Sequence, residues 1–246
     1  GTTFLYDQLI RHPKLIGADP ADSSKRKYIK EPRLLLKDDM NKEKYISAFQ
    51  KNSISKPKGN ILFDASTAYS KWPLKFISPG IFDAISDEYT CIYVVRDPID
   101  RFESHINFKY QYRKEILKYG LDKIFDFKWA MLALNIGNYA MQLTEYKGMY
   151  EKGKLLILDF NELVNDTRKC LEKICKKIDI DINDLPPNNK KSIPNKTSDF
   201  VSNYSTSGML KPFSSVMSWQ RKIPAHKVNK NYKFYQKLFN LKPLPK

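Results

Sequence analysis

The chain has 246 residues, of which 41% are hydrophobic and 28% are charged. This fraction of hydrophobic residues is too high for a chain that is disordered because it has few of them. It is enough for one sizeable hydrophobic core. Lys and Arg number 43 against 27 Asp and Glu, and the resulting net charge of +16 favours an anionic partner. No run approaches the roughly 18 apolar residues that a transmembrane helix needs. We therefore expect a single domain over residues 1–246 with no membrane span.

The pattern of apolar residues predicts an α/β domain, because short and nearly continuous apolar runs alternate with longer stretches of helical period. In chain order we expect a helix at 4–12, a strand at 60–64, a strand at 91–95, helices at 101–117 and 129–150, a strand at 155–160 and a helix at 165–178. Asp166 or Thr167 is the expected N-cap of the last helix. Two long polar connections, residues 19–57 and 184–224, are expected to be surface loops around a site.

The three cysteines argue against disulfide bonds. They are odd in number, and two of them lie five residues apart in the sequence CLEKIC, on one expected helix. Cys and His residues do not occur at the close spacing that is typical of a metal site. We interpret the cysteines, Cys91, Cys170 and Cys175, as structural thiols of a reducing compartment. The glycosylation sequons at Asn165, Asn195 and Asn203 would matter only in a secretory lumen.

The first candidate site is the string Gly1-Thr2-Thr3 immediately before the first expected helix. A helix N-terminus offers unpaired N–H groups and a partial positive charge, glycine permits close approach of the backbone, and threonine hydroxyls add donors. These are the features of a phosphate-binding turn. On these residues alone, simple helix capping is the favoured explanation, because Gly-Thr-Thr is a short and common string.

The second candidate site begins with Arg96, where an expected strand ends, and continues into the following helix as far as Ser104. Ligands of open parallel sheets bind beyond the carboxyl ends of the strands, and an arginine fork donates two hydrogen bonds to a phosphate. The alternative is an Arg–Asp surface pair beside a helix that Pro98 initiates. Two phosphate-compatible turns in one domain suggest a ligand with two separated phosphates.

The strings GTTFLYDQLIRHP and RDPIDRFESHINF resemble the 5′ and 3′ phosphate-binding signatures of sulfotransferases that use 3′-phosphoadenosine-5′-phosphosulfate (PAPS). NILFDASTAY resembles the family's acidic-Ala-Ser-Pro-x-Tyr strand and loop, with Thr67 in place of the usual proline. The resemblance extends over about residues 1–200. It implies a P-loop-like three-layer α/β fold in which helices flank a central parallel sheet.

The resemblance also implies roles for individual residues. Glu31, in the Lys-Glu-Pro stretch, becomes the base that takes the proton of the acceptor, with His105 a weaker candidate. The residues Arg33-Leu34-Leu35-Leu36 depart from the His and aromatic residues that the family often has there. No metal is required. The residues implied to bind the cofactor are Gly1, Thr2, Thr3 and Phe4 at the 5′-phosphosulfate, Arg96 and Ser104 at the 3′-phosphate, and Asn195, Lys196 and Thr197 in a closing loop.

In the family, a strand and a lysine come just before the Gly-Thr-Thr string. That lysine stabilises charge on the leaving phosphate and the transferring sulfonate. We expect the strand and the lysine to precede Gly1 in the complete protein.

We expect a sulfotransferase that moves a sulfonate group from PAPS to a hydroxyl or amine and releases adenosine 3′,5′-bisphosphate. A carbohydrate, such as an anionic polysaccharide or oligosaccharide, is the favoured acceptor, and a lipid, polyketide or small-molecule alcohol is the alternative. A P-loop nucleotide kinase lacks its Gly-Lys-Ser/Thr string here, and a nucleic-acid-binding module lacks a zinc or RNA-recognition motif. The expected location is cytoplasmic, or the Golgi lumen if a membrane anchor lies upstream.

Overall fold

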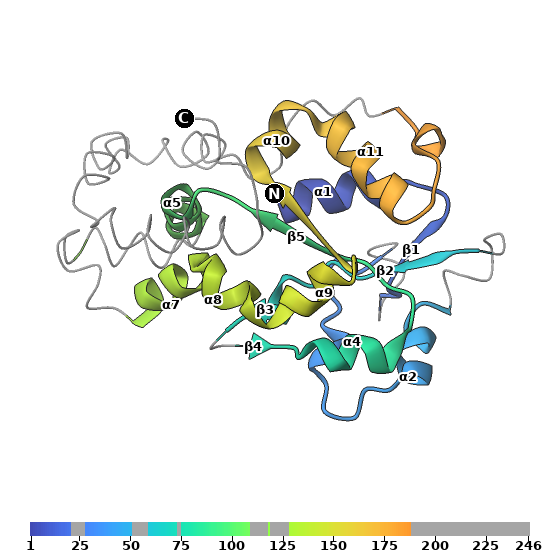
Figure 1. Ribbon diagram of the computed structural model, residues 1–246, viewed down its shortest axis with the longest axis horizontal. Helices are drawn as coiled ribbons and strands as arrows, with labels where there is room; N and C mark the ends of the chain where they lie inside the picture. Colours follow the sequence, from blue (N-terminus) through green and yellow to red (C-terminus); the bar gives the residue numbers. More distant parts are fainter. Residues whose placement is uncertain (21–27, 51–58, 73–74, 109–117, 119–127, 188–246) are drawn as a thin grey trace. The chain divides into compact units, whose positions relative to one another are not determined.

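The computed structural model describes residues 1–20, 28–50, 59–72, 75–108, 118 and 128–187 (Figure 1). The chain divides into two compact units. Unit 1 comprises Gly1–Val95 and Glu145–Ser192, and unit 2 comprises Arg96–Thr144 and Ile193–Lys246. Within the described residues, no helix is both long and apolar enough to cross a membrane.

Among the residues that the structure describes, unit 1 contains three pairs of strands. Two pairs are parallel, β1 with β2 and β5 with β6, and the pair β3 with β4 is antiparallel. In the β5–β6 pair, Cys91 lies opposite Leu155 and Val95 lies opposite Asp159, so both strands end at the same edge. The bounds are β1 Leu15–Gly17, β2 Ile61–Phe63, β3 Ser70–Lys71, β4 Lys75–Phe76, β5 Cys91–Val95 and β6 Leu155–Asp159.

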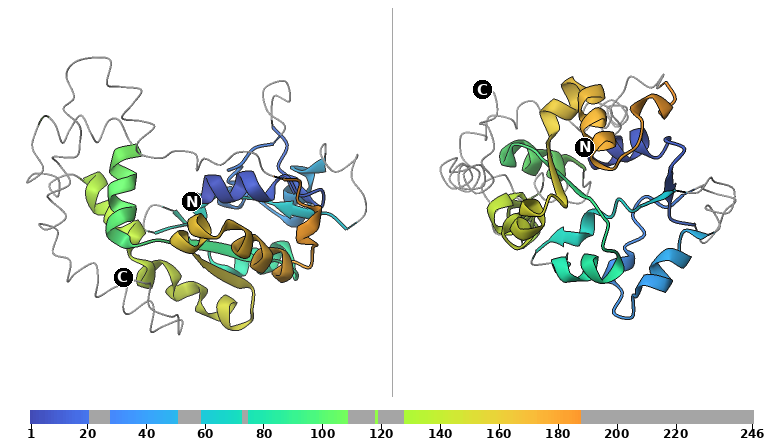
Figure 2. Two further views of the ribbon diagram at one scale, coloured as in Figure 1. Left: turned by 90° about the horizontal axis from the view of Figure 1, so that it is seen from above. Right: turned by 45° about the vertical axis from the view of Figure 1, so that its right-hand side comes forward.

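Helices cover both faces of the β5–β6 pair within unit 1. Helices α1 and α11 lie on one side of these strands, and α9 and α4 lie on the other (Figures 1 and 2). The unit is therefore built in three layers. The bounds are α1 Thr2–Leu9, α2 Lys42–Ser47, α4 Pro79–Ile85, α9 Lys147–Glu151, α10 Phe160–Asn165 and α11 Thr167–Lys177, with short 3₁₀ turns at Leu34–Leu36, Thr67–Tyr69 and Ile182–Asp184.

The described part of unit 2 consists of three helices. These are α5 Pro98–Phe108, α7 Lys128–Gly137 and α8 Tyr139–Leu143. Phe102 of α5 is fully buried, and the Arg101 guanidinium donates a hydrogen bond to the Ala133 carbonyl of α7 at 2.9 Å. Helices α5 and α7 therefore pack against each other, and this hydrogen bond links them.

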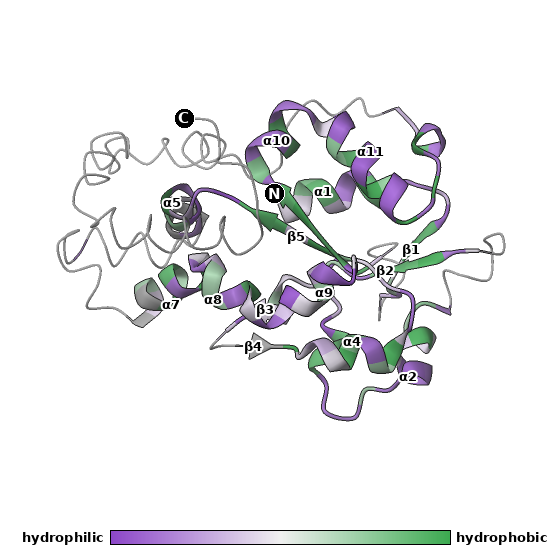
Figure 3. Ribbon diagram, viewed as in Figure 1, coloured by the Kyte–Doolittle hydropathy of each residue, from purple (hydrophilic) through white to green (hydrophobic). Residues whose placement is uncertain are grey.

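The strand predictions agree closely with the structure. The expected 91–95 strand is β5 without change, and the other two expected strands are each one or two residues longer than β2 and β6. Apolar residues dominate β5 and β6, whereas α11 has one apolar and one polar face (Figure 3). The apolar face of α11 includes Cys170 and Cys175, which are buried, and all three cysteines are free thiols.

The expected continuous helix over 129–150 is wrong. The segment breaks after Gly137, and the Asn138 side chain accepts a hydrogen bond from the Met141 N–H, which starts a new helix. Glycine favours the end of a helix and asparagine favours the start of the next one as its N-cap. Together they outweigh the helical spacing of apolar residues that continues through this segment. A 3₁₀ turn at Thr144–Tyr146 then separates α8 from α9.

Several other element boundaries differ from the expectation. Helix α1 starts and ends earlier than expected, and α5 begins at Pro98 because the Asp97 carboxylate accepts hydrogen bonds from the Ile99 and Asp100 N–H groups. Asp166 is the N-cap of α11, as one of the two expected residues. The apolar pattern does not predict β1, α2, the β3–β4 hairpin or α4, because these elements are short and carry little periodic signal.

Truncation of Leu158 tests the packing of the β5–β6 layer. Leu158 is 1% exposed, so Leu158→Ala is expected to leave a cavity and lower the free energy of unfolding by about 3 kcal/mol. Urea unfolding followed by circular dichroism measures this change. Ile46→Ala on α2, where the side chain is 43% exposed, is the control and should cost well under half as much. Equal costs for the two variants would contradict the assigned core.

Candidate functional site

The N-terminus of α1 lies at the carboxyl edge of the β5–β6 pair. A Cβ atom added to Gly1 would lie 2.7 Å from the Phe160 Cδ2 atom and 3.4 Å from the Val94 Cγ1 atom. Val94 is near the end of β5, and Phe160 directly follows β6. Only glycine therefore fits at this position without displacing the Phe160 ring.

The first turn of α1 has the composition of an anion-binding turn. Its N-cap is Gly1, which has no side chain to cap the first N–H groups, and the turn contains no acidic residue. Thr2 is exposed, Thr3 is half-buried and Phe4 is buried, so the aromatic ring anchors the turn while the two hydroxyls remain accessible to different degrees. N–H groups at a helix N-terminus that no side chain caps, at the carboxyl edge of parallel strands, suit a phosphate.

In unit 2, the structure connects Arg96 to two neighbouring residues. The Arg96 backbone N–H donates to the Tyr139 hydroxyl at 3.1 Å, and its guanidinium lies 3.7 Å from an Asp100 carboxylate oxygen. The Arg96 side chain is 30% exposed, and Ser104 lies half-buried two turns further along α5. The expected alternative, an Arg–Asp pair beside a proline-initiated helix, is thus present. An arginine side chain with this exposure can still bind an anion.

Tyr139 is a residue that the sequence analysis did not single out. Its ring is 3% exposed, and burial raises the pKa of its hydroxyl, so that it stays protonated. It fixes the backbone at Arg96, directly after β5. The signal in the sequence that could have pointed to Tyr139 is its position, as an aromatic residue directly after the helix break at Gly137-Asn138. The expected cofactor residues Asn195, Lys196 and Thr197 lie outside the described residues.

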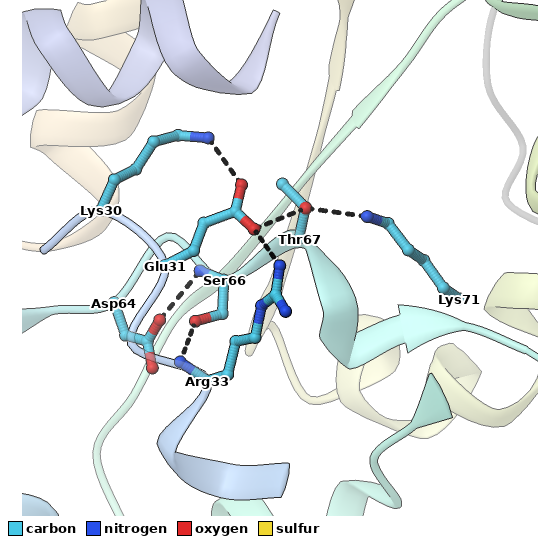
Figure 4. A network of polar contacts seen from close by, with 7 residues as sticks. All are labelled: Lys30, Glu31, Arg33, Asp64, Ser66, Thr67 and Lys71. Atoms are coloured by element: carbon cyan, nitrogen blue, oxygen red, sulfur yellow. Dashed lines mark hydrogen bonds and ion pairs between the residues drawn. The ribbon is translucent and has the colours of Figure 1, made fainter. Parts of the chain in front are cut away.

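A group of polar side chains surrounds Glu31 in unit 1 (Figure 4). The Lys30 ammonium donates to Oε1 of Glu31 at 3.0 Å, and the Thr67 hydroxyl donates to Oε2 at 3.2 Å. The Arg33 guanidinium lies 3.8 Å from Oε2, and the Lys71 ammonium donates to the Thr67 hydroxyl at 3.0 Å. The Glu31 side chain is 27% exposed. We call these five residues the Glu31 cluster.

Two opposed effects determine the charge of Glu31. Burial disfavours its carboxylate, but hydrogen bonds from Lys30 and Thr67 and the positive charges of Lys30 and Lys71 outweigh burial, so the pKa of Glu31 lies below its usual value. Glu31 is therefore ionised at neutral pH. An ionised, partly exposed carboxylate is able to accept a proton from a hydroxyl group.

The segment that carries Glu31 is bound to the turn after β2 by hydrogen bonds around the half-buried Asp64. The Asp64 carboxylate accepts hydrogen bonds from the Ser66 N–H at 2.8 Å and from the Tyr69 hydroxyl. The Ser66 hydroxyl accepts from the Arg33 N–H at 2.8 Å, and the Tyr69 hydroxyl accepts from the Leu35 N–H at 3.3 Å. These bonds hold Arg33 at a positive φ of 54°, a conformation that a non-glycine residue rarely adopts.

Comparison with known proteins identifies the family. The family model described as "Sulfotransferase domain" matches residues 78–242, which is more than half of the chain. The chain belongs to the sulfotransferase family. A solved structure of similar fold, a sulfotransferase from Alicyclobacillus acidocaldarius, has a TM-score of 0.60 and 14% identity, over 99% of this chain and 92% of that chain. A search of curated proteins finds no match.

The family and fold predictions are thereby confirmed: this sulfotransferase has the expected α/β three-layer fold. The matched residues contain Arg96, Ser104 and Tyr139, whereas Gly1–Phe4 and Glu31 precede them. The roles of all these residues stay predictions. Among the residues that the structure describes, no group of three His, Cys, Asp or Glu side chains is arranged to hold a metal ion.

The pH dependence of stability tests the desolvation of Asp64 in this sulfotransferase. Burial raises the pKa of Asp64 above its usual value despite the hydrogen bonds from Ser66 and Tyr69, so the folded protein holds this proton more tightly than the unfolded chain. Ionisation of Asp64 therefore opposes folding as the pH rises from the unfolded pKa through the folded one. Asp64→Asn removes that dependence and keeps an oxygen acceptor for Ser66.

We expect the stability advantage of the wild type over Asp64→Asn to be largest at acidic pH and to shrink as the pH rises. Urea unfolding from pH 3.5 to 7.5 measures the difference. Asp38→Asn, at an exposed position, is the control and should leave the pH profile close to that of the wild type. An advantage that grows with pH would show that Asp64 is stabilised as a carboxylate.

Proposed function

We propose that this sulfotransferase transfers the sulfonate group of PAPS to a hydroxyl of a carbohydrate and releases adenosine 3′,5′-bisphosphate. The acceptor oxygen forms a bond to sulfur, the bond between sulfur and the 5′-phosphate oxygen breaks, and the hydroxyl proton passes to the Glu31 carboxylate. The observation that carries the proposal is the state of Glu31, an ionised and partly exposed carboxylate that three neighbours hold in place.

The first turn of α1 is the proposed binding site for the 5′ end of PAPS. Its N–H groups and the hydroxyls of Thr2 and Thr3 would donate to the phosphosulfate, and the positive end of the helix favours the charge that develops on the leaving phosphate. Gly1 allows this turn to lie against the strand ends. Arg96 and Ser104 are the proposed partners of the 3′-phosphate, as the family resemblance implies, and Lys196 is a further proposed donor.

The charges around Glu31 favour an anionic acceptor. Three cations, Lys30, Arg33 and Lys71, belong to the Glu31 cluster. The Arg33 side chain is 57% exposed and is able to bind a carboxylate or sulfate on a sugar next to the reacting hydroxyl. The net charge of +16 also attracts a polyanion over longer distances. We therefore propose an acidic polysaccharide or oligosaccharide as the acceptor.

Calorimetric titration with adenosine 3′,5′-bisphosphate tests the donor site. We expect micromolar binding by the wild type, much weaker binding of ADP, and a loss of at least about tenfold in Arg96→Ala, because one charged hydrogen-bonding partner of a phosphate is removed. The control is Arg168→Ala, which removes an exposed arginine that pairs with Glu172 on α11. Full affinity in Arg96→Ala would overturn the assignment of the 3′-phosphate.

Replacement of Glu31 tests the proposed base. Glu31→Gln keeps the shape and the hydrogen bond from Thr67 but cannot take a proton, so we expect kcat to fall about 100-fold to 10,000-fold. Transfer of radiolabelled sulfonate from PAPS to chondroitin or desulfated heparin measures the rate, with a long-chain alcohol as the competing acceptor class. Glu172→Gln on the exposed face of α11 is the control. Unchanged kcat in Glu31→Gln would exclude Glu31 as the base.

A further inference from the structure

We infer that Thr67 and Lys71 are positioning residues that hold Glu31 through a directed pair of hydrogen bonds, from the Lys71 ammonium to the Thr67 hydroxyl and from that hydroxyl to Oε2 of Glu31 (Figure 4). The inference rests on the proposed role of Glu31 as the base.

The direction of both hydrogen bonds follows from the chemistry of the end groups. The Lys71 ammonium is only a donor, so at 3.0 Å the Thr67 oxygen must act as its acceptor. An ionised Glu31 carboxylate is only an acceptor, so at 3.2 Å the Thr67 hydroxyl must turn its single proton towards Oε2. The hydroxyl thus has one orientation, and it passes the influence of the Lys71 charge to Glu31.

The two oxygens of Glu31 have different environments as a result. Oε1 accepts from Lys30, which is the preceding residue and moves with the same segment. Oε2 accepts from Thr67, and the Arg33 guanidinium at 3.8 Å is beyond ordinary hydrogen-bond distance. Thr67 is therefore the partner that fixes the carboxylate relative to a separate part of the chain. Valine has a similar shape and would leave Oε2 without this donor.

The support for this arrangement is rigid. Thr67 begins the 3₁₀ turn Thr67–Tyr69, whose Ala68 is 6% exposed, and Lys71 follows in β3. Asp64 holds the start of the same turn through its bonds from Ser66 and Tyr69, and the Ala65 N–H donates to the Lys30 carbonyl at 3.1 Å. The turn that carries Thr67 is thus bound directly to the segment that carries Glu31.

The charged groups that surround Glu31 come from both segments. Lys30 and Arg33 lie on its own segment, and Lys71 and the half-buried Asp64 lie on the segment after β2. Burial raises the pKa of Glu31, whereas the Thr67 hydroxyl and the Lys71 charge lower it. Loss of the hydroxyl or of the Lys71 charge is therefore expected to make the Glu31 carboxylate bind a proton more readily. That change is measurable without any enzymatic turnover.

The experiment titrates the Glu31 carboxyl carbon by ¹³C NMR, with the resonance assigned by its loss in Glu31→Gln. We expect Thr67→Val and Lys71→Met to raise the pKa of Glu31, Thr67→Ser to restore the wild-type titration, and Lys147→Met, which removes an exposed lysine of α9, to change nothing. Thermal unfolding of each variant confirms that it is folded. If Thr67→Val fails to fold, Thr67→Ser and Lys71→Met still decide the question.

A parallel assay measures the pH profile of sulfonate transfer from PAPS to chondroitin. In Thr67→Val we expect kcat/KM to fall about tenfold on the acid side of the profile, the acid limb to move to higher pH, and the KM for PAPS to stay unchanged. A Glu31 titration that is identical in wild type, Thr67→Val and Lys71→Met would overturn the inference. Full activity of Glu31→Gln would overturn only the proposed role of Glu31, because the NMR readout is independent of turnover.

Discussion

The half-buried carboxylate of Asp64 is the group on which the geometry around Glu31 depends. It lies after β2 and accepts hydrogen bonds from the Ser66 N–H and the Tyr69 hydroxyl. The hydroxyls of Ser66 and Tyr69 in turn accept hydrogen bonds from the backbone N–H groups of residues 33 and 35. One carboxylate thereby joins two segments that are distant in sequence. A charge buried with so few donors is costly, and this network supplies donors that make it tolerable.

Two neighbouring carboxyl groups respond to their surroundings in opposite ways. Both residues are half-buried, but desolvation raises the pKa of Asp64, whereas the cations and hydrogen-bond donors around Glu31 lower its pKa. The first serves structure and the second is available for chemistry. Two nearby carboxyl groups whose pKa values are shifted in opposite directions are common where acid–base chemistry takes place, because a different physical effect sets the pKa of each group.

The family match and the structural details support the proposed function at different levels. The match to residues 78–242 establishes a sulfotransferase, and the similar fold of the Alicyclobacillus acidocaldarius enzyme extends over nearly the whole chain. The finer proposal depends on the Glu31 cluster and on the first turn of α1, both of which lie before residue 78. A side chain at position 1 would meet the Phe160 ring, so glycine allows the start of α1 to lie against the strand ends.

The sequence alone determined the α/β class and the position of β5, because these depend on local apolar runs, and its short motifs predicted two phosphate-binding turns. It also identified Glu31, through the Lys-Glu-Pro stretch. It did not reveal that Thr67 and Lys71 act on Glu31, or that Tyr139 holds the backbone at Arg96. The Thr67–Glu31 contact joins residues that are 36 positions apart in the sequence, and the Tyr139–Arg96 contact joins residues that are 43 positions apart. Only the packing of strands and turns brings such groups within hydrogen-bond distance.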